Sequence, residues 1–511
     1  MSGAGSTSGE RPEVRAPAGA VRGRREAGVA VFRGIPFAEP PVGALRLAAP
    51  HGIPSWGDDV RDAASFGPPP PQGGSFGADA TEHDSGDAGW LTVNVWTPDP
   101  VAGVGLPVMV WVQGGGYQIG TSGLPEYDGG RLAAGGVVVV TFNYRVGAEG
   151  FAWVEGAAAN RGLLDQVAAL GWVRENIASF GGDPDRVTVF GESAGGGSVA
   201  ALLAMPSAAG LFGRAVVQSM PGTFFAPELA AEVAVAIAAE LGVRPTVAGL
   251  AALAPSRLAA AGDAVGATMP EHADRWGLPA RRRIPFSPVV DGEVLPATPW
   301  QALAAGAGRD VELLAGHTRD EHRLFAALEG LLGQVDDELA EEALAHFAPG
   351  PEGARRYRDA FPTAGPEELF ELVGSDWLFR MPSLHLAEAQ LAGGGRAHLY
   401  ELAWPAPGMG GALGACHGLD VPLVFGNLDR GQPAVLIGSP PSPEAEAVSG
   451  WMRAAWLRFA TDGDPGWPGY DTTGRPTRVF DAEPVVRSYP EEGSRRVWQH
   501  HTFAALGLVG P

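Results

Sequence analysis

A serine at the centre of a Gly-x-Ser-x-Gly pattern directly follows a run of β-branched residues. The segment VTVFGESAGGGSV covers residues 187–199, and Ser193 is the serine of the pattern. The run before Ser193 predicts a β-strand, and the small residues after it predict a helix. A serine on such a strained strand-to-helix turn exposes its hydroxyl above the sheet edge. The candidate chemistry is therefore nucleophilic acyl transfer by Ser193.

The pattern alone is weak evidence, because the chain contains it twice. The second copy is Gly-Gly-Ser-Phe-Gly at residues 73–77. That copy follows a run of prolines and precedes no predicted helix, so it is interpreted as an ordinary turn. Only Ser193 has a predicted strand before it and a predicted helix after it, which is the context that supports the motif.

A glycine-rich loop upstream offers a place for the oxyanion that acyl transfer creates. The segment WVQGGGYQIG at residues 111–120 follows a predicted strand. Consecutive glycines can turn their amides inward with no side chain in the way. Such amides, together with the amide of Ala194 after the nucleophile, would stabilise a tetrahedral oxyanion. The alternative is an ordinary glycine-rich turn, which is the expected fate of the pair at 129–130.

A base and an acid should follow the serine in the chain order Ser, acid, His. His417 lies in a loop after the predicted strand at 397–404, at the carboxyl end of the sheet where α/β sites assemble. Asp320 and Glu321 come just after another predicted strand, at 311–316. Their positions alone favour neither as the acid that orients His417.

Other histidines and the single cysteine have less specific interpretations. His317 and His322 flank the acidic pair, so a metal site is an alternative. It is the weaker one, because no His-Glu-x-x-His motif occurs and a Ser–His network needs no metal. His398 is expected to be structural, and the histidines at 500 and 501 to be solvated. Cys416 lies outside any nucleophile turn and is expected to be a buried structural thiol.

Alternating strands and helices predict an α/β fold with a mostly parallel sheet covered on both faces. A helix is predicted at 162–180, where apolar residues recur at three- and four-residue spacing before Gly181-Gly182. A hairpin is predicted at 14–32 and a proline- and glycine-rich loop at 67–87. Two helical excursions, at 226–258 and 324–391, are expected to form a lid or gorge wall. Residues 1–12 are expected to be disordered, and 13–511 to form a single domain.

Composition limits the function classes. The chain has 511 residues, of which 45% are hydrophobic, enough for a large core. Its net charge of −22 argues against nucleic-acid binding. The chain contains no lysine, which excludes Schiff-base chemistry and a P-loop. It has one cysteine, no signal-peptide h-region and no apolar run long enough to span a bilayer, so a soluble cytoplasmic protein is expected.

A series of motifs carries a resemblance to a known family. They are FRGIPFAEPPVGALR (32–46), LTVNVWTP (91–98), NYRVGAEGF (143–151), the long segment at 160–196 that ends in GESAGG, VVQS (216–219), HTRDEHRLF (317–325) and CHGLDVPLVFGN (416–427). In this order they resemble the type-B carboxylesterases, which include cholinesterases and bacterial p-nitrobenzyl esterases. The resemblance implies an α/β-hydrolase fold with an N-terminal hairpin and helical lid or gorge excursions.

The resemblance also implies roles for individual residues. It makes Ser193 the nucleophile, Glu321 the acid in preference to Asp320, and His417 the base. It assigns the oxyanion hole to the amides of Gly115, Gly116 and Ala194.

Three departures from the family pattern stand out. Gln113 replaces the usual histidine before the glycines, Met220 replaces the glycine of Gln-Ser-Gly, and the early cysteine block reads Ser-Gly-Asp-Ala-Gly-Trp at 85–90. The missing cysteine fits a reducing cytoplasm.

The predicted function is therefore serine-dependent hydrolysis of a small apolar carboxylic ester, through an acyl-enzyme and without cofactor or metal. Alternatives are an acyltransferase, an amide or carbamate hydrolase with the same triad, and a non-catalytic binding relative. Glu192 could favour neutral or cationic substrates. The oligomeric state is not readable from the sequence. Candidate pocket-lining aromatic residues, each of which could equally belong to the core, are Tyr117, Phe224, Phe225, Trp377 and Phe379.

Overall fold

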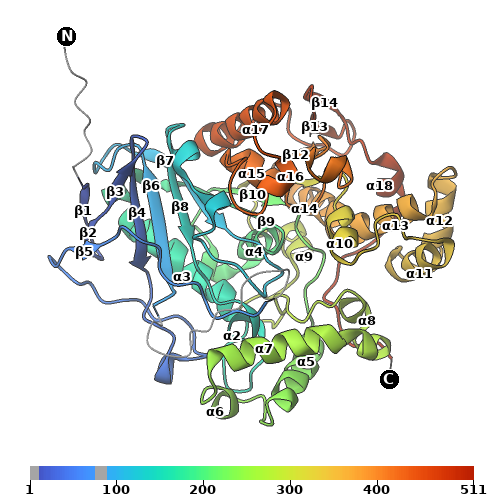
Figure 1. The fold of residues 1–511 in the computed structure, drawn as a ribbon, viewed down its shortest axis with the longest axis horizontal. Helices are drawn as coiled ribbons and strands as arrows, with labels where there is room; N and C mark the ends of the chain where they lie inside the picture. The colour runs from blue at the N-terminus through green and yellow to red at the C-terminus, as the bar shows by residue number, and fades with distance from the viewer. Residues whose placement is uncertain (1–10, 75–88, 511) are drawn as a thin grey trace.

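The structure is a computed structural model that describes residues 11–74 and 89–510. Its centre is an 11-stranded sheet in which the seven middle strands run parallel, as the sequence predicts (Figure 1). The strands of this sheet, in spatial order, are β14 (Val485–Ser488), β13 (Pro476–Phe480), β12 (Ala397–Leu402), β11 (Glu312–Thr318), β10 (Arg214–Gln218), β9 (Gly182–Glu192), β7 (Leu106–Val112), β8 (Val138–Phe142), β6 (Thr92–Thr97), β4 (Val29–Pro36) and β3 (Arg24–Glu26).

Both faces of the sheet are buried along its central strands, which explains why the inner segments of these strands are mainly apolar. Side chains alternate between two cores along β7, where Val108 and Val110 belong to one core and Met109 and Trp111 to the other. Helices α3 (Arg161–Asn176), α4 (Ala194–Ala204) and α14 (Met381–Ala392) pack on the first face. Helices α15 (Asp420–Phe425) and α17 (Pro443–Asp462) pack on the second. Because these strands run parallel, the carboxyl ends of β9, β11 and β12 lie at the same edge of the sheet.

The predicted N-terminal hairpin is present as two consecutive hairpins. Strands β1 (Glu13–Ala16) and β2 (Gly19–Arg22) pair antiparallel and, with β5 (Arg61–Asp62), form a separate small sheet. The next hairpin, β3–β4, joins the edge of the large sheet. The predicted helix at 162–180 is α3 followed by a 3₁₀ turn, Ile177–Phe180, which ends at Gly181 with φ 86°. A left-handed residue at this position is an ordinary way to terminate a helix.

The two predicted excursions are helical, but their bounds differ from the prediction. The first continues beyond 258, because α7 and α8 extend it to 281 (green in Figure 1). The second ends before 391, because α14 packs directly on β11 and β12 instead of standing away from the sheet. The helices of the two excursions are α5 (Pro227–Glu240), α6 (Val247–Leu250), α7 (Pro255–Thr268), α8 (Ala273–Arg281), α10 (His322–Leu328), α11 (Asp337–Phe347), α12 (Gly353–Ala360) and α13 (Pro366–Ser375).

Short helices complete the connections. They are α1 (Gly130–Ala133), α2 (Gly147–Phe151), α9 (Pro299–Ala304), α16 (Ala434–Ile437) and α18 (Glu492–Trp498). None of the helices in the described part of the chain is both long and apolar enough to cross a membrane. The predicted disordered lead at 1–12, most of the loop at 67–87 and the second Gly-x-Ser-x-Gly copy lie largely outside the described residues.

Candidate active site

Ser193 stands at the turn between β9 and α4 with a strained backbone. Its φ of 57° and ψ of −127° are rare for a residue with a side chain. This conformation is unfavourable by itself, and contacts with the surrounding structure must stabilise it. The Ser193 amide donates to the Gln218 carbonyl at 3.0 Å, and the Ser193 carbonyl accepts from the Gly197 amide at 2.9 Å. These two bonds hold the serine where the strand ends and the helix begins, with its side chain half-buried.

The glycines on either side of Ser193 are required by close backbone approaches. A Cβ built at Gly191 would lie 2.6 Å from the carbonyl carbon of Gly195. A Cβ at Gly195 would collide with the carbonyl oxygen of Val112, at the end of β7. The Gly-x-Ser-x-Gly pattern therefore has a steric cause here, since neither position has room for a side chain.

His417 and Glu321 meet although 96 residues separate them in the chain. The Nδ1 atom of His417 lies 2.6 Å from Oε2 of Glu321, and the Thr318 amide donates to Glu321 Oε1 at 2.8 Å. Glu321 follows β11 and His417 follows β12, so the parallel pairing of these two strands brings their following loops together. A carboxylate on Nδ1 fixes the tautomer of the imidazole and leaves Nε2 free to act as a base.

Asp320, the other acidic candidate, has a different set of contacts. Its Oδ2 lies 3.1 Å from the Arg319 guanidinium and accepts from the Ala415 amide at 2.8 Å. The Asp320 amide in turn donates to the Ala415 carbonyl at 2.9 Å. Asp320 thus ties down the loop that carries His417, whereas Glu321 contacts the imidazole itself.

The second imidazole nitrogen faces another carboxylate. His417 Nε2 lies 3.2 Å from Glu192 Oε1, yet neither atom forms a hydrogen bond of good geometry with any residue in the described ranges. Catalytic hydrogen bonds often tighten only when substrate is bound. His417 Nε2 is therefore available for a proton.

Charges around His417 favour its protonated form. Burial alone would lower the pKa of His417, but the carboxylates of Glu192 and Glu321 outweigh burial and raise that pKa to about 9. Burial raises the pKa of Glu192 to about 8. Burial would also raise the pKa of Glu321, but His417 outweighs it and lowers that pKa. The imidazole and its two carboxylates are thus one interacting group rather than independent sites.

A third buried carboxylate, Asp420, acts electrostatically on Glu192. Asp420 Oδ2 accepts from Gln218 Nε2 and from the Tyr400 hydroxyl, each at 2.9 Å. Burial raises the pKa of Asp420 to about 6, and its charge contributes to the raised pKa of Glu192. Sequence reasoning passed over Asp420, although its place three residues after His417 could have pointed to it.

The glycine loop lies directly against the nucleophile turn. A Cβ at Gly114 would lie 3.1 Å from the Ser193 Cβ, so the two backbones are in close contact. Gly115 and Gly116 have φ values of 111° and 61°, which favour glycine. Within the described ranges, the amides of these two residues donate to no carbonyl or side chain, and the amide of Ala194 begins α4 where no intrahelical partner exists. Three candidate donors are thus unengaged beside Ser193.

Comparison with known proteins agrees with this geometry. The carboxylesterase family matches residues 10–486 of the chain. The para-nitrobenzyl esterase of Bacillus subtilis is 37% identical over 492 residues, which cover 94% of this chain and 96% of that protein. The chain belongs to the carboxylesterase family. Its membership and its esterase relatives identify it as a carboxylic-ester hydrolase.

Solved structures of carboxylesterases share the fold. The Geobacillus stearothermophilus carboxylesterase superposes with a TM-score of 0.83 and 35% identity, covering 96% of this chain and all of that one. A PNB esterase structure gives a TM-score of 0.82 with 37% identity, covering 96% and 99% of the two chains. The predicted α/β-hydrolase fold and the predicted family resemblance are both confirmed.

Gln113, which replaces the usual family histidine, is fully buried. Neither atom of its side-chain amide has a hydrogen-bond partner among the described residues. The backbone carbonyl of Gln113 accepts from the Tyr144 hydroxyl at 2.7 Å. In this carboxylesterase the start of the glycine loop is therefore held through its backbone, and the glutamine side chain adds no hydrogen bond within the described ranges.

One of the five predicted pocket aromatics contacts the imidazole. The ring of Phe379 stacks on His417 with centroids 4.1 Å apart. The ring of Phe325, which sequence reasoning missed, lies 5.3 Å from His417 and stacks on Phe379 at 5.7 Å. Phe325 lies four residues after Glu321, one helical turn along α10, and that spacing could have revealed it.

The other four predicted aromatics are buried against core neighbours rather than against His417. Tyr117 packs on Phe151 at 4.8 Å, Trp377 on Phe347 at 4.9 Å and Phe224 on Trp300 at 5.5 Å. Phe225 is buried, and its amide donates to the Pro288 carbonyl at 2.9 Å.

The alternative metal site around the acidic pair is not assembled. His317 Nε2 contacts the Tyr489 hydroxyl at 2.9 Å, and the His322 ring contacts Arg282. The two imidazoles therefore have separate partners. In the described ranges, no group of three His, Cys, Asp or Glu side chains could hold a metal ion.

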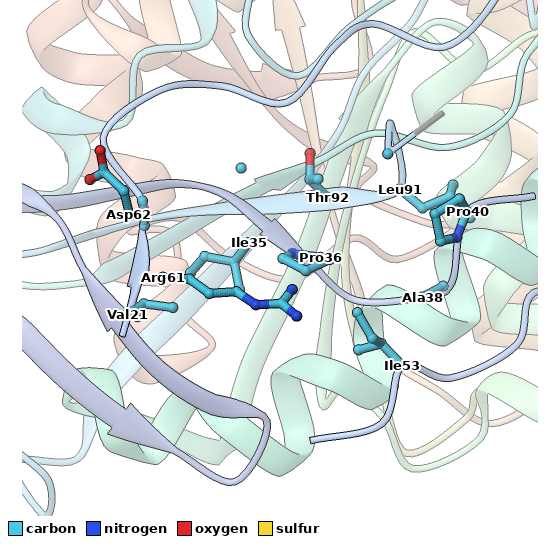
Figure 2. A pocket seen from close by; sticks show the side chains of 13 residues that line it. Val21, Ile35, Pro36, Ala38, Pro40, Ile53, Arg61, Asp62, Leu91 and Thr92 are labelled. Carbon is cyan, nitrogen blue, oxygen red and sulfur yellow. The ribbon is translucent and has the colours of Figure 1, made fainter. Parts of the chain in front are cut away.

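A cavity of about 430 Å³ lies at the N-terminal side of the sheet, between the small sheet and strand β4 (Figure 2). Val21, Ile35, Pro40 and Leu91 are among the side chains around it, and the Arg61 side chain extends among the lining residues. None of its described lining residues is Ser193, His417 or Glu321, so this cavity is separate from the candidate active site.

Proposed function

We propose that this carboxylesterase hydrolyses small, apolar, neutral carboxylic esters with Ser193 as nucleophile, His417 as general base and Glu321 as the acid that orients His417. The single observation that carries the proposal is the 2.6 Å contact of Glu321 with His417 Nδ1, which leaves Nε2 without a hydrogen bond of good geometry in the described ranges. The strained turn of Ser193 and its steric need for two flanking glycines support the assignment of the nucleophile.

The proposed reaction uses these residues in two successive half-reactions. His417 Nε2 takes the proton of Ser193 as its Oγ attacks the ester carbonyl, and Glu321 stabilises the imidazolium. The oxyanion is stabilised by the amides of Gly115, Gly116 and Ala194. His417 then gives the proton to the leaving alcohol, an acyl-enzyme remains, and water activated by the same imidazole releases the acid.

The expected substrate is apolar because aromatic rings, Phe379 and Phe325, pack against the imidazole. Relatives named para-nitrobenzyl esterase and carboxylesterase 1D support an ester substrate. The proposed setting is the bacterial cytoplasm, with residues 13–511 acting as one catalytic domain and without nucleic-acid partners. The bacterial esterase relative and the net charge of −22 support this setting.

Covalent labelling tests the proposal directly. A fluorophosphonate probe should attach to Ser193, and peptide mapping by mass spectrometry should find the adduct on the peptide that contains GESAGG. Exclusive attachment to another serine, or no attachment to enzyme that turns over p-nitrophenyl esters, would exclude Ser193 as the nucleophile. Product analysis with competing alcohols and amines distinguishes a hydrolase from an acyltransferase.

A further inference from the structure

The glycine loop and the nucleophile helix touch at a second point, one helical turn beyond Ser193. A Cβ built at Gly197 would lie less than 3.0 Å from the hydroxyl oxygen of Tyr117. The phenolic oxygen therefore occupies the space that any other residue at position 197 would need. Pro221 closes the same space from another side, with its Cδ 3.1 Å from that Cβ position.

The Tyr117 hydroxyl cannot easily move out of this space. Its ring is buried and packs on Phe151, and a tyrosine side chain has only two torsions through which to adjust. Among the described residues, no hydrogen bond of good geometry engages this hydroxyl. The neighbouring Ser198 hydroxyl accepts from Gln166 at 3.0 Å and also interacts with the Tyr117 hydroxyl. Packing, together with this neighbouring hydroxyl, thus fixes where the phenol lies.

Both partners are directly connected to the proposed chemistry. Tyr117 immediately follows Gly115 and Gly116, and its own backbone has a φ of 60°. Its carbonyl accepts from the Gly147 amide at 2.7 Å, which anchors the end of the loop. Gly197 donates its amide to the Ser193 carbonyl at 2.9 Å and so closes the first turn of α4. A shift at either residue would change the distance between the oxyanion donors and Ser193.

We propose that the Tyr117 hydroxyl, seated on the bare backbone of Gly197, is a positioning contact that sets the oxyanion loop at its working distance from Ser193. The contact rests on the proposed oxyanion role of Gly115 and Gly116. Tyr117 thereby acts through the loop backbone rather than on the substrate, which accounts for its burial.

A double-mutant cycle with Gly197→Ala and Tyr117→Phe tests this contact. Gly197→Ala alone should displace the loop, and a misplacement of about 1 Å can cost about 10²-fold in rate. We therefore expect kcat for a p-nitrophenyl ester to fall by about 10- to 100-fold while KM changes little. Binding of a trifluoromethyl ketone, which forms a tetrahedral oxyanion on Ser193, should weaken in parallel.

The double variant should recover most of the lost kcat, because removing the hydroxyl frees the space that the new methyl group needs. Gly171→Ala is the matched control: this glycine also lies in a helix, α3, but a Cβ there meets no atom within 4 Å. The control should keep wild-type kcat.

The outcomes separate this contact from the triad assignment. A Gly197→Ala enzyme with wild-type kcat, or a double variant no better than Gly197→Ala, overturns the positioning contact even if Ser193→Ala is inactive. If Gly197→Ala does not fold, a double variant that is folded and active supports the contact. A double variant that is also unfolded contradicts it. An active Ser193→Ala enzyme would instead overturn the proposed function.

Discussion

At the scale of single residues, the charge of Glu192 helps to set the pKa of His417. His417 must be neutral to accept a proton, so activity rises as pH increases through its pKa. The Glu192 and Glu321 carboxylates oppose burial and raise that pKa to about 9. Glu192→Gln removes one negative charge 3.2 Å from Nε2. We therefore expect the acid limb of the kcat/KM–pH profile to shift to lower pH in this variant. An acid limb identical to that of wild type would show that Glu192 does not act on His417.

The two adjacent acids should respond very differently to loss of charge. Glu321→Gln should lower kcat by about 10⁴-fold, by analogy with the aspartate of the serine-protease triad. Asp320→Asn is its matched control, because Asp320 contacts Arg319 and the Ala415 amide but not the imidazole. It should retain most of kcat and lose some thermal stability. Equal losses of kcat in the two variants would contradict the assignment of Glu321.

Sequence reasoning reached Ser193, His417 and the Asp320–Glu321 pair, because these residues lie at motif or strand-end positions. It could not reach the contact between Glu192 and His417, since that contact depends on how the loop after β12 folds back over β9. Nor could it separate Phe379 from Trp377, which lie two residues apart but have different partners.

At the scale of elements, a π-helical turn, Asp376–Arg380, carries Phe379 to the imidazole. A buried ion pair holds this turn: Arg380 lies 2.7 Å from Asp376, and Asp376 also accepts from the Tyr357 hydroxyl at 2.6 Å. The sequence predicted a helical excursion here but not the π turn, because the extra residue is accommodated by these buried contacts rather than by local preference. π turns are often found at functional sites.

Removing one partner of the Asp376–Arg380 ion pair should lower the stability of the protein. Asp376→Ala leaves the Arg380 charge buried, although Glu491 remains 3.3 Å from it, and should lower the free energy of unfolding by about 3–5 kcal/mol. The matched control is Arg355→Ala on α12, whose pairs with Glu352 and Asp359 are exposed to solvent and should contribute little to the free energy of unfolding. Urea unfolding measures both. Equal small effects would mean that the buried pair does not stabilise the turn.

Other element bounds differ from the prediction for tertiary reasons. Helix α14 follows the excursion helices directly in the chain, yet it covers β11 and β12. Similarly, the second N-terminal hairpin, β3–β4, extends the large sheet, whereas β1–β2 pairs with β5 instead. Where each of these elements packs depends on which surfaces of the sheet the rest of the chain leaves uncovered. A local sequence pattern does not specify those surfaces.

At the scale of the whole molecule, the net charge of −22 should influence substrate encounter. Anionic esters should be repelled and cationic esters attracted at low ionic strength. Raising the salt concentration from about 0.01 to 0.15 M shortens the Debye length from about 30 to about 8 Å. We expect kcat/KM to rise with salt for an anionic ester, to fall for a cationic ester and to stay constant for a neutral one. The same salt response for all three esters would contradict electrostatic steering.

The whole account depends on Ser193, and its replacement by alanine is the most direct test. Ser193→Ala removes only an oxygen from a half-buried side chain, so circular dichroism should show a wild-type fold. Turnover of a p-nitrophenyl ester should fall by about 10⁶-fold in kcat, as in triad knockouts of another serine hydrolase. Near-wild-type turnover by the folded Ser193→Ala enzyme would contradict the assignment of Ser193 as the nucleophile.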